Sequence, residues 1–285
     1  ARLAGPQVHQ VCLPPLPNAL TLDHVLRAAG QGGLDGSHWR QSPPFGSLHT
    51  PIALLDDPEN QTQKPLILDF AGAGGHLAIV GAPQTGKSTL LRTLIASFMV
   101  THSPRDVQFY CIDPGGGNLR ALEAAPHVGA VVGLVERDKI RRLLEKMRTI
   151  KEERTYLFQQ QGVDSMTAYR LRRQAGDLAD EPYGDVFLVI DDAARFLREF
   201  DLLEVELTDL VASGLAYGIH VVLTARRWAD FKSKVIDNVG SRLELRLIEL
   251  SESMAGKTAA GRLPPNVPGR GLLKNGMPFQ AALPT

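Results

Sequence analysis

One stretch of eight residues limits the possible folds of this chain more than any other feature. It fits the pattern G-x-x-x-x-G-K-S/T throughout and consists of Gly81, Ala82, Pro83, Gln84, Thr85, Gly86, Lys87 and Ser88. The preceding residues 77–80 are apolar, as in a buried strand, and residues 90–99 repeat apolar side chains at helical spacing. Between a strand and a helix, such glycines let successive backbone N–H groups point at a phosphate. The pattern therefore predicts a phosphate-binding loop. A glycine-rich turn that fits by chance is the weaker alternative.

Two side chains of this loop have specific expected roles. We expect the Lys87 ammonium to bind the β- and γ-phosphates of ATP and the Ser88 hydroxyl to ligate Mg²⁺. The positive N-terminal end of the following helix adds to the attraction for phosphate. Residues 81–88 and the adjoining Thr89 are therefore the predicted nucleotide-binding residues.

A second apolar run ends in two carboxylates. Residues 186–190 are apolar without interruption, as in a buried parallel strand, and Asp191 and Asp192 follow them. A carboxylate at the tip of a buried strand is costly unless it has a partner there. We therefore predict that Asp191, together with Ser88, holds the magnesium ion directly or through water. The alternative for Asp191 is a cap of the next helix.

Two residues are candidates for the hydrolytic step itself. Asp192 stands where many related ATPases carry a carboxylate, usually Glu, that orients the attacking water, so its side chain is one methylene short. The alternative for Asp192 is a helix cap. Thr224 ends the apolar run 221–223 and is placed like a polar sensor of the γ-phosphate or the water. The alternative for Thr224 is a hydroxyl that satisfies backbone groups.

Arginines near the end of the chain are candidates for a trans-acting role. An arginine that reaches the nucleotide of a neighbouring subunit can raise the rate by about 10³–10⁵. Arg226, Arg227 and Arg242 are the candidates, and we assign this role to Arg242. An exposed arginine that is merely solvated is the alternative for each.

Apolar runs alternate with helical patterns through most of the chain. The predicted strands are 77–80, 107–112, 186–190 and 221–223, and the predicted helices are 90–99, 140–150 and 203–211, with Gly214 or Gly218 ending the last helix. This alternation indicates an α/β fold with a mostly parallel sheet and helices on both faces. Residues 243–247 predict an edge strand with one solvated face, and Asn275-Gly276 predicts a hairpin turn.

The first part of the chain has a different composition. Residues 1–60 are rich in Pro, Gly and His, and repeated prolines disfavour regular structure. We expect residues 1–60 to form a linker arm that packs on the core, with one short helix near residues 22–29. Residues 61–285 are expected to form the nucleotide-binding domain.

Charge and hydropathy narrow the functional classes. The formal net charge is zero, whereas proteins that grip nucleic acid usually carry an excess of Lys and Arg, so no nucleic-acid partner is expected. No run approaches the roughly 18 apolar residues that mark a membrane span. Cys111 lies in an apolar run far from Cys12, which indicates a buried reduced thiol and fits a cytosolic compartment. Because the chain does not begin with Met, we expect it to be a piece of a longer protein, which leaves room for a membrane anchor outside this sequence.

Several stretches, together with the phosphate loop and residues 186–192, resemble the EccC ATPases of type VII (ESX) secretion systems, within the FtsK/SpoIIIE group of hexameric motors. They are the arm Leu13-Pro14-Pro15-Leu16-Pro17, with Leu20-Thr21-Leu22-Asp23 after it; Asp113-Pro114-Gly115-Gly116-Gly117; His220-Val221-Val222-Leu223-Thr224-Ala225; Ser241-Arg242-Leu243-Glu244-Leu245-Arg246-Leu247; and the tail from Pro268-Gly269-Arg270-Gly271 to Ala281-Ala282-Leu283-Pro284. The resemblance covers nearly the whole chain.

This resemblance implies a RecA/FtsK-like P-loop NTPase fold and one ATPase domain of a motor that uses ATP and Mg²⁺ to export small helical-hairpin proteins. It implies a middle or late domain of several strung behind a membrane anchor, at the cytoplasmic face of the cell membrane. The implied partners are the adjoining ATPase domains, the membrane components of the secretion complex and the exported substrates, with a hexamer as the assembled form. The first domain of the group carries Asp-Glu where this chain has Asp191-Asp192, so weak hydrolysis by the isolated chain is expected.

Three other functions are open on the residues alone. Asp192 suggests a regulatory or docking module in which ATP is bound with little hydrolysis. A double-stranded DNA translocase is the other activity of this superfamily, and the balanced charge disfavours it. A small-molecule kinase is the least favoured, because the sequence shows no second substrate pocket or lid.

Overall fold

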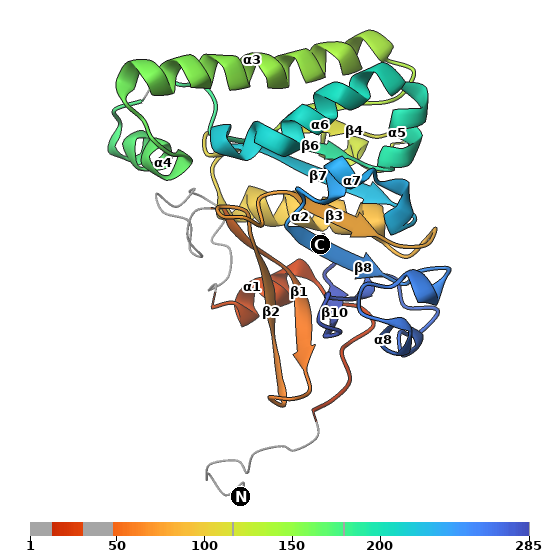
Figure 1. Ribbon diagram of the computed structural model, residues 1–285. Helices are drawn as coiled ribbons and strands as arrows, with labels where there is room; N and C mark the ends of the chain where they lie inside the picture. The colour runs from red at the N-terminus through yellow and green to blue at the C-terminus, as the bar shows by residue number, and fades with distance from the viewer. Residues whose placement is uncertain (1–12, 31–47, 116, 179, 285) are drawn as a thin grey trace, which may run out of the picture.

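Ten strands form one mixed sheet (Figure 1). The computed structural model describes residues 13–30, 48–115, 117–178 and 180–284, so that Cys12, Gly116 and residues 31–47 of the expected arm lie outside the described residues. The strands are β1 (His49–Asp57), β2 (Thr62–Asp69), β3 (Leu77–Val80), β4 (Val107–Ile112), β5 (Val128–Val132), β6 (Asp185–Ile190), β7 (Ile219–Ala225), β8 (Ser241–Leu245), β9 (Arg270–Leu272) and β10 (Pro278–Ala281). Their order across the sheet is β2-β1-β10-β9-β8-β3-β7-β6-β4-β5.

The larger part of this sheet, from β8 to β5, is parallel. Every residue of β3, β6 and β7 is buried, which is why these strands read as continuous apolar runs in the sequence. Parallel strands end at the same edge of a sheet. The loop after β3, the carboxylates after β6 and the polar residues at the end of β7 therefore emerge side by side.

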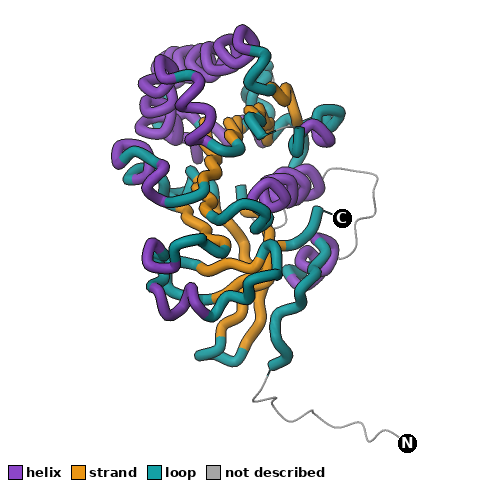
Figure 2. The backbone as a smooth tube through the Cα atoms, turned by 90° about the vertical axis from the view of Figure 1, so that its right-hand side faces the viewer, coloured by secondary structure: helices purple, strands orange, loops and turns teal. Residues whose placement is uncertain are grey.

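Helices cover both faces of the parallel part, as the sequence predicts. They are α1 (Leu22–Ala28), α2 (Lys87–Thr101), α3 (Arg137–Gln161), α4 (Met166–Ala175), α5 (Ala193–Glu199), α6 (Glu204–Ser213), α7 (Ser233–Ile236) and α8 (Lys257–Gly261). One face carries α2, and the other carries α3, α5 and α6 (Figure 1). In Figure 2 the strands form a continuous band through the molecule with the helices beside it. Within the described part of the chain, no helix combines the length and apolar character needed to cross a bilayer.

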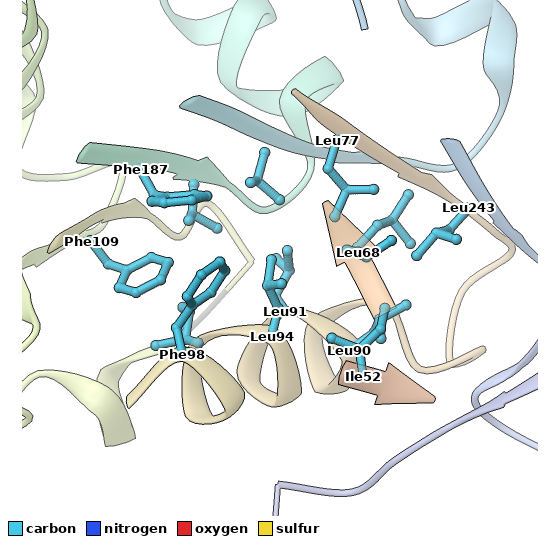
Figure 3. Packing of buried hydrophobic residues seen from close by; sticks show 14 of the residues in the cluster. Ile52, Leu68, Leu77, Leu90, Leu91, Leu94, Phe98, Phe109, Phe187 and Leu243 are labelled. Atoms are coloured by element: carbon cyan, nitrogen blue, oxygen red, sulfur yellow. The ribbon is translucent and has the colours of Figure 1, made fainter. Parts of the chain in front are cut away.

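The apolar stripe of α2 packs against the centre of the sheet. Figure 3 shows Leu90, Leu91, Leu94 and Phe98 pointing from this helix toward the strands. The Phe98 ring lies 5.1 Å from the Phe187 ring of β6, measured between centroids. Burial of each such side chain stabilises the fold by about 1.5–3 kcal/mol. This packing fixes the first turn of α2, and with it the end of the phosphate loop.

The predicted helix and turn positions agree with the structure. The short helix expected near residues 22–29 is α1. The helix α6 ends at Ser213 and continues as a 3₁₀ turn that stops at Gly218, whose φ is 66°. The hairpin expected at Asn275-Gly276 joins β9 and β10, and the Gly276 N–H donates to the Leu273 carbonyl at 2.9 Å.

The edge strand predicted at residues 243–247 is wrong. β8 lies inside the sheet, between β3 and β9, and its residues 243–245 are buried. The alternation had suggested a solvated face for Glu244. Instead, the Glu244 carboxylate is buried and accepts hydrogen bonds from the Trp228 indole at 2.8 Å and the Met254 N–H at 3.0 Å. The hairpin of β9 and β10 extends the sheet beyond β8. The alternation of apolar and charged residues in 243–247 carries no information about a partner strand that lies so far along the chain.

Strand β1 was not expected, because Pro51 lies within it and prolines surround it. It pairs with β2 on one side and β10 on the other, and Pro51 sits where the β1–β2 register shifts. A bulge tolerates proline because one ladder hydrogen bond is already absent there. Residue 60, the expected limit of the arm, falls in the turn between β1 and β2.

A buried polar cluster ties the amino ends of β6 and β7 together. Asp185 accepts two hydrogen bonds from the Arg170 guanidinium of α4, both at 2.8 Å, and its Oδ1 lies 3.0 Å from His220 Nε2. Burial opposes the ionised carboxylate, but the bonds from Arg170 and His220 prevail and hold the pKa of Asp185 well below its usual range. The cluster anchors the end of the sheet opposite the phosphate loop.

His76, just before β3, is a buried neutral histidine. Its Nδ1 accepts the Val221 N–H at 2.9 Å, and its Nε2 lies 2.9 Å from the Val211 carbonyl. The ring must therefore carry its proton on Nε2 alone. Burial, with a contribution from the nearby His220, lowers the pKa of His76 from 6.5 to about 4.

This burial predicts a loss of stability in mild acid. The unfolded His76 takes up a proton below pH 6.5, whereas the folded residue does so only near pH 4, so stability falls as the pH decreases between these values. Between pH 7 and pH 5 the contribution of His76 is about 2 kcal/mol. Urea unfolding of His76→Gln at both pH values should show a shallower pH dependence by about this amount. His24→Gln, on the exposed surface of α1, should keep the dependence of the parent chain.

Candidate functional site

The phosphate loop lies at the carboxyl end of β3 and is tied to both neighbouring strands. The Gly81 N–H donates to the Ala225 carbonyl of β7 at 3.2 Å, and the Ala82 N–H donates to the Arg246 carbonyl after β8 at 2.8 Å. The tip of the loop, Pro83 and Gln84, is exposed. The sequence placed this loop correctly between a strand and a helix.

Glycine is required where the loop enters α2. Gly86 has a φ of 102°, and a Cβ atom there would lie 2.9 Å from the Gly269 nitrogen. The Gly269 N–H also donates to the Thr85 carbonyl at 2.8 Å. The loop is thus clamped by the segment before β9, a contact that the sequence does not show.

Lys87 folds back over the loop. Its Nζ donates to the Gly81 and Ala82 carbonyls at 2.7 and 2.9 Å. Burial lowers the pKa of Lys87, and the like charge of Arg226 adds to this, while Asp191 opposes it. A phosphate at the loop would add negative charge beside this partly buried ammonium, in addition to that of Asp191 and Asp192.

Ser88 and Asp191 meet across the site, as predicted for a magnesium pair. The Ser88 hydroxyl donates to Asp191 Oδ2 at 2.6 Å, and the Thr224 hydroxyl donates to Asp191 Oδ1 at 2.6 Å. Burial raises the pKa of Asp191, and the neighbouring Asp113 raises it further, against the two hydroxyl bonds. A cation beside Asp191 would favour the ionised form.

Asp192 directly precedes α5 as its N-cap and has a left-handed backbone, with a φ of 63°. Its Oδ1 accepts the Arg195 N–H at 3.1 Å, which is the helix-cap arrangement. Its N–H donates to the Thr224 hydroxyl at 2.8 Å, and its Oδ2 lies 3.9 Å from Arg226 Nη2. Asp192 thus directly follows the predicted metal ligand Asp191, and its carboxylate makes the capping contact.

Thr224 joins the two aspartates. Its hydroxyl donates to the Asp191 carboxylate and accepts the Asp192 N–H, so that both of its bonds are to the end of β6. The sequence suggested either a sensor or a hydroxyl that satisfies backbone. The observed contacts include the second alternative and add a side-chain bond to the predicted metal ligand.

Arg242 is not brought to this site. It is the second residue of β8 and lies beside Ala78 in the register, whereas the loop begins after Val80. Its guanidinium donates to the Val239 and Ile236 carbonyls at 3.1 and 2.5 Å. A role in a neighbouring subunit stays a prediction for this residue.

Two charged neighbours, Arg226 and Asp113, were not placed at this site from the sequence. Arg226 was considered only for a trans-acting role, and Asp113, which is buried and influences Asp191, was not assigned a role. Both follow strands of the parallel sheet directly, β7 and β4. Polar residues that directly follow adjacent parallel strands lie close together at one edge of the sheet. This rule, applied to the sequence, would have placed both Arg226 and Asp113 at the site.

The donor set fits a magnesium ion. Mg²⁺ prefers oxygen ligands, takes few from the protein and fills its other positions with water and phosphate oxygens. Ser88 and Asp191 supply a hydroxyl and a carboxylate oxygen that already lie in contact. The half-buried Lys87 above the loop is suited to the phosphates.

Comparison with known families and proteins agrees with this geometry. The model of the FtsK/SpoIIIE family matches residues 46–281. The ESX secretion system protein EccC of Thermomonospora curvata is 44% identical over an alignment of 285 positions, which covers 98% of this chain and 21% of that protein. The ESX-1 secretion system protein EccCb1 of Mycobacterium tuberculosis is 40% identical over 269 residues, which are 94% of this chain and 43% of that protein. The chain therefore spans less than half the length of these relatives.

Solved structures show the same similarity. The cytoplasmic domain of the Thermomonospora curvata type VII secretion ATPase EccC superposes with a TM-score of 0.90 at 41% identity, over 99% of this chain and 33% of that one. A structure of ATPases 2 and 3 of the same EccC, in complex with a signal sequence peptide, gives a TM-score of 0.86 at 41% identity, over 95% of this chain and 49% of that one. These matches confirm the predicted resemblance to EccC and the P-loop NTPase fold. The chain belongs to the FtsK/SpoIIIE family.

Proposed function

We propose that this chain is an ATP-binding and ATP-hydrolysing domain of a type VII secretion motor. The observation that carries the proposal is the Ser88–Asp191 hydrogen bond of 2.6 Å beside the Lys87 loop. It joins the predicted phosphate site and the predicted metal ligand in one place. The membership in the FtsK/SpoIIIE family supports the ATPase activity.

The residues of the site would act as follows. Lys87 would bind the β- and γ-phosphates, the loop N–H groups would surround them, and Ser88 and Asp191 would hold Mg²⁺. Bound Mg²⁺ supplies positive charge that stabilises the charge developing on the transferred phosphoryl group. Asp192 would orient the attacking water, and Thr224 would keep both aspartates in position.

The wider role rests on the EccC relatives. We propose that ATP binding and hydrolysis by this domain drive export of small helical-hairpin proteins, with adjoining ATPase domains and membrane components of the secretion complex as partners. A hexamer at the cytoplasmic face of the cell membrane is the proposed assembly. One structure of EccC ATPases 2 and 3 holds a signal sequence peptide, which supports peptide recognition within that family.

A second candidate function is a nucleotide-binding docking module with little hydrolysis. The capping contact of Asp192 with the Arg195 N–H favours it, because a carboxylate engaged in a helix cap is less available to a water molecule. The two candidates differ in turnover, whereas both require ATP binding.

Replacement of Lys87 tests the nucleotide site that both candidates share. Lys87→Ala removes the ammonium that binds two phosphates, so affinity for Mg-ATP should fall by about a hundredfold or more, measured by titration calorimetry. Lys257→Ala, on the exposed surface of α8, should bind as the parent chain does. Equal affinity of Lys87→Ala and the parent would refute the proposed site.

Replacement of Thr224 tests its positioning role. Thr224→Val keeps the shape but leaves the Asp192 N–H and one Asp191 oxygen without their partner, so the free energy of unfolding should fall by about 1–3 kcal/mol. ATP turnover should fall as well, because both aspartates lose a support. Thr224→Ser restores the hydroxyl and should recover most of both quantities. Identical behaviour of the Val and Ser variants in urea unfolding and turnover assays would contradict this role.

Lengthening Asp192 distinguishes the two candidate functions. Asp192→Glu adds the methylene that related ATPases have, so steady-state ATP turnover should rise by about tenfold to a hundredfold if Asp192 orients the water. Asp192→Asn removes the charge and should lower turnover. The docking-module alternative gains support if all three proteins turn over ATP at the same basal rate while they bind it normally.

A further inference from the structure

Arg226 directly follows the strand residue that is hydrogen-bonded to Gly81, the first glycine of the phosphate loop. The preceding residue, Ala225, ends β7 and accepts the Gly81 N–H through its carbonyl at 3.2 Å. The Arg226 N–H donates to Asp230 Oδ2 at 3.1 Å, which fixes the base of the side chain. The side chain itself is 60% exposed. An anchored backbone thus carries a side chain that is free to change partner.

The Arg226 guanidinium points toward the Asp192 carboxylate at the end of β6. Its Nη2 is 3.9 Å from Asp192 Oδ2. Burial lowers the pKa of Lys87, and the charge of Arg226 adds to this effect, so the two cations lie within electrostatic range of each other. Two cations therefore influence each other at the site, with Asp191 and Asp192 as counter-charges. An anion between Lys87 and Arg226 would relieve the repulsion of these cations.

The contact with Asp192 is weak enough to be exchanged. A pair separated by 3.9 Å with an exposed guanidinium contributes little, because water screens it. Within the described part of the chain this is the one ion pair of Arg226. A phosphate offers the guanidinium two parallel charged hydrogen bonds, which are stronger than such a surface pair.

We propose that Arg226 binds the γ-phosphate of the nucleotide held in its own chain and leaves Asp192 when it does so. This inference rests on the nucleotide site proposed above. With ATP bound, the Asp192 carboxylate is released beside the γ-phosphate. Without a γ-phosphate, Arg226 returns to Asp192. Arg226 is thus the residue with which this domain distinguishes ATP from ADP.

Arg227 provides a matched control. It is the next residue and is similarly exposed, with 53% of its side chain accessible. Its guanidinium lies 3.7 Å from Asp230 and 3.9 Å from Glu252. It therefore has the same charge and nearly the same position in the chain, but acidic partners outside the phosphate site.

The test compares the affinities for Mg-ATPγS and Mg-ADP of the parent chain, Arg226→Ala, Arg226→Lys and Arg227→Ala. Titrations are made at protein concentrations where sedimentation shows monomers, so that no neighbouring subunit contributes. Arg226→Ala should weaken ATPγS binding by about tenfold to a hundredfold and change ADP binding by less than about threefold. Arg226→Lys should fall between the parent and Arg226→Ala, because Lys keeps the charge but loses the bidentate geometry. Arg227→Ala should match the parent.

The possible outcomes separate this inference from the proposed function. A parent chain that binds neither nucleotide overturns the proposed function and this inference together. A parent that binds both, with an unchanged ATPγS-to-ADP ratio in Arg226→Ala, overturns the inference alone. Equal weakening of both nucleotides also overturns it, because the contact is then not with the γ-phosphate. An effect that appears only after assembly would assign Arg226 to a neighbouring subunit and overturn the role within its own chain.

A double-mutant cycle tests the exchange with Asp192. Asp192→Asn removes the competing partner and a negative charge, so ATPγS affinity should rise by a few-fold relative to ADP. In the Arg226→Ala background this gain should shrink, because the arginine that was released is absent. Full additivity of the two substitutions would show that the Arg226–Asp192 contact is not coupled to γ-phosphate binding.

Discussion

The short hydrogen bond between Ser88 and Asp191 is the contact on which the site depends. It joins the first turn of α2 to the tip of β6, and Thr224 of β7 completes the junction. The three groups meet because β3, β7 and β6 are adjacent and parallel and therefore end at one edge. The burial of these strands and of the α2 stripe holds that edge rigid, so polar groups from distant parts of the sequence keep contact distances below 3 Å.

The polar groups of the site satisfy one another. Lys87 bonds to the loop carbonyls, Ser88 to Asp191, and Arg226 lies near Asp192. Burial disfavours the charged forms of both Lys87 and Asp191. A triphosphate with its cation would supply the opposite charge at each of these points. In the proposed function, binding of Mg-ATP would therefore exchange these internal partners for the ligand, and the affinity would depend on how weakly the internal contacts hold.

The sequence predicted those parts of the molecule that local patterns determine. The phosphate loop, α2 and the strands that lead to Asp191 and Thr224 follow from apolar periodicity and the glycine pattern. The position of β8 inside the sheet depends on its pairing with β9, whose nearest residue lies 25 positions further along the chain. Strand β1 was not predicted because it contains Pro51. The position of Arg226 relative to Asp192 is likewise a long-range fact, as is the clamp of Gly269 on Thr85. Local patterns identify elements, whereas distant pairing decides their neighbours.

The clamp on the phosphate loop has a mechanical consequence. The Gly269 N–H holds the Thr85 carbonyl, the Gly269 carbonyl accepts the Ala281 N–H, and Leu283 bonds to the backbone of residues 20 and 22. The arm, the C-terminal hairpin and the phosphate loop are thus connected one after another by backbone hydrogen bonds. The length of each bond can change by only a fraction of an ångström before the bond breaks. A displacement of either the arm or the hairpin would therefore also displace Thr85, which lies two residues before Lys87 in the proposed phosphate site.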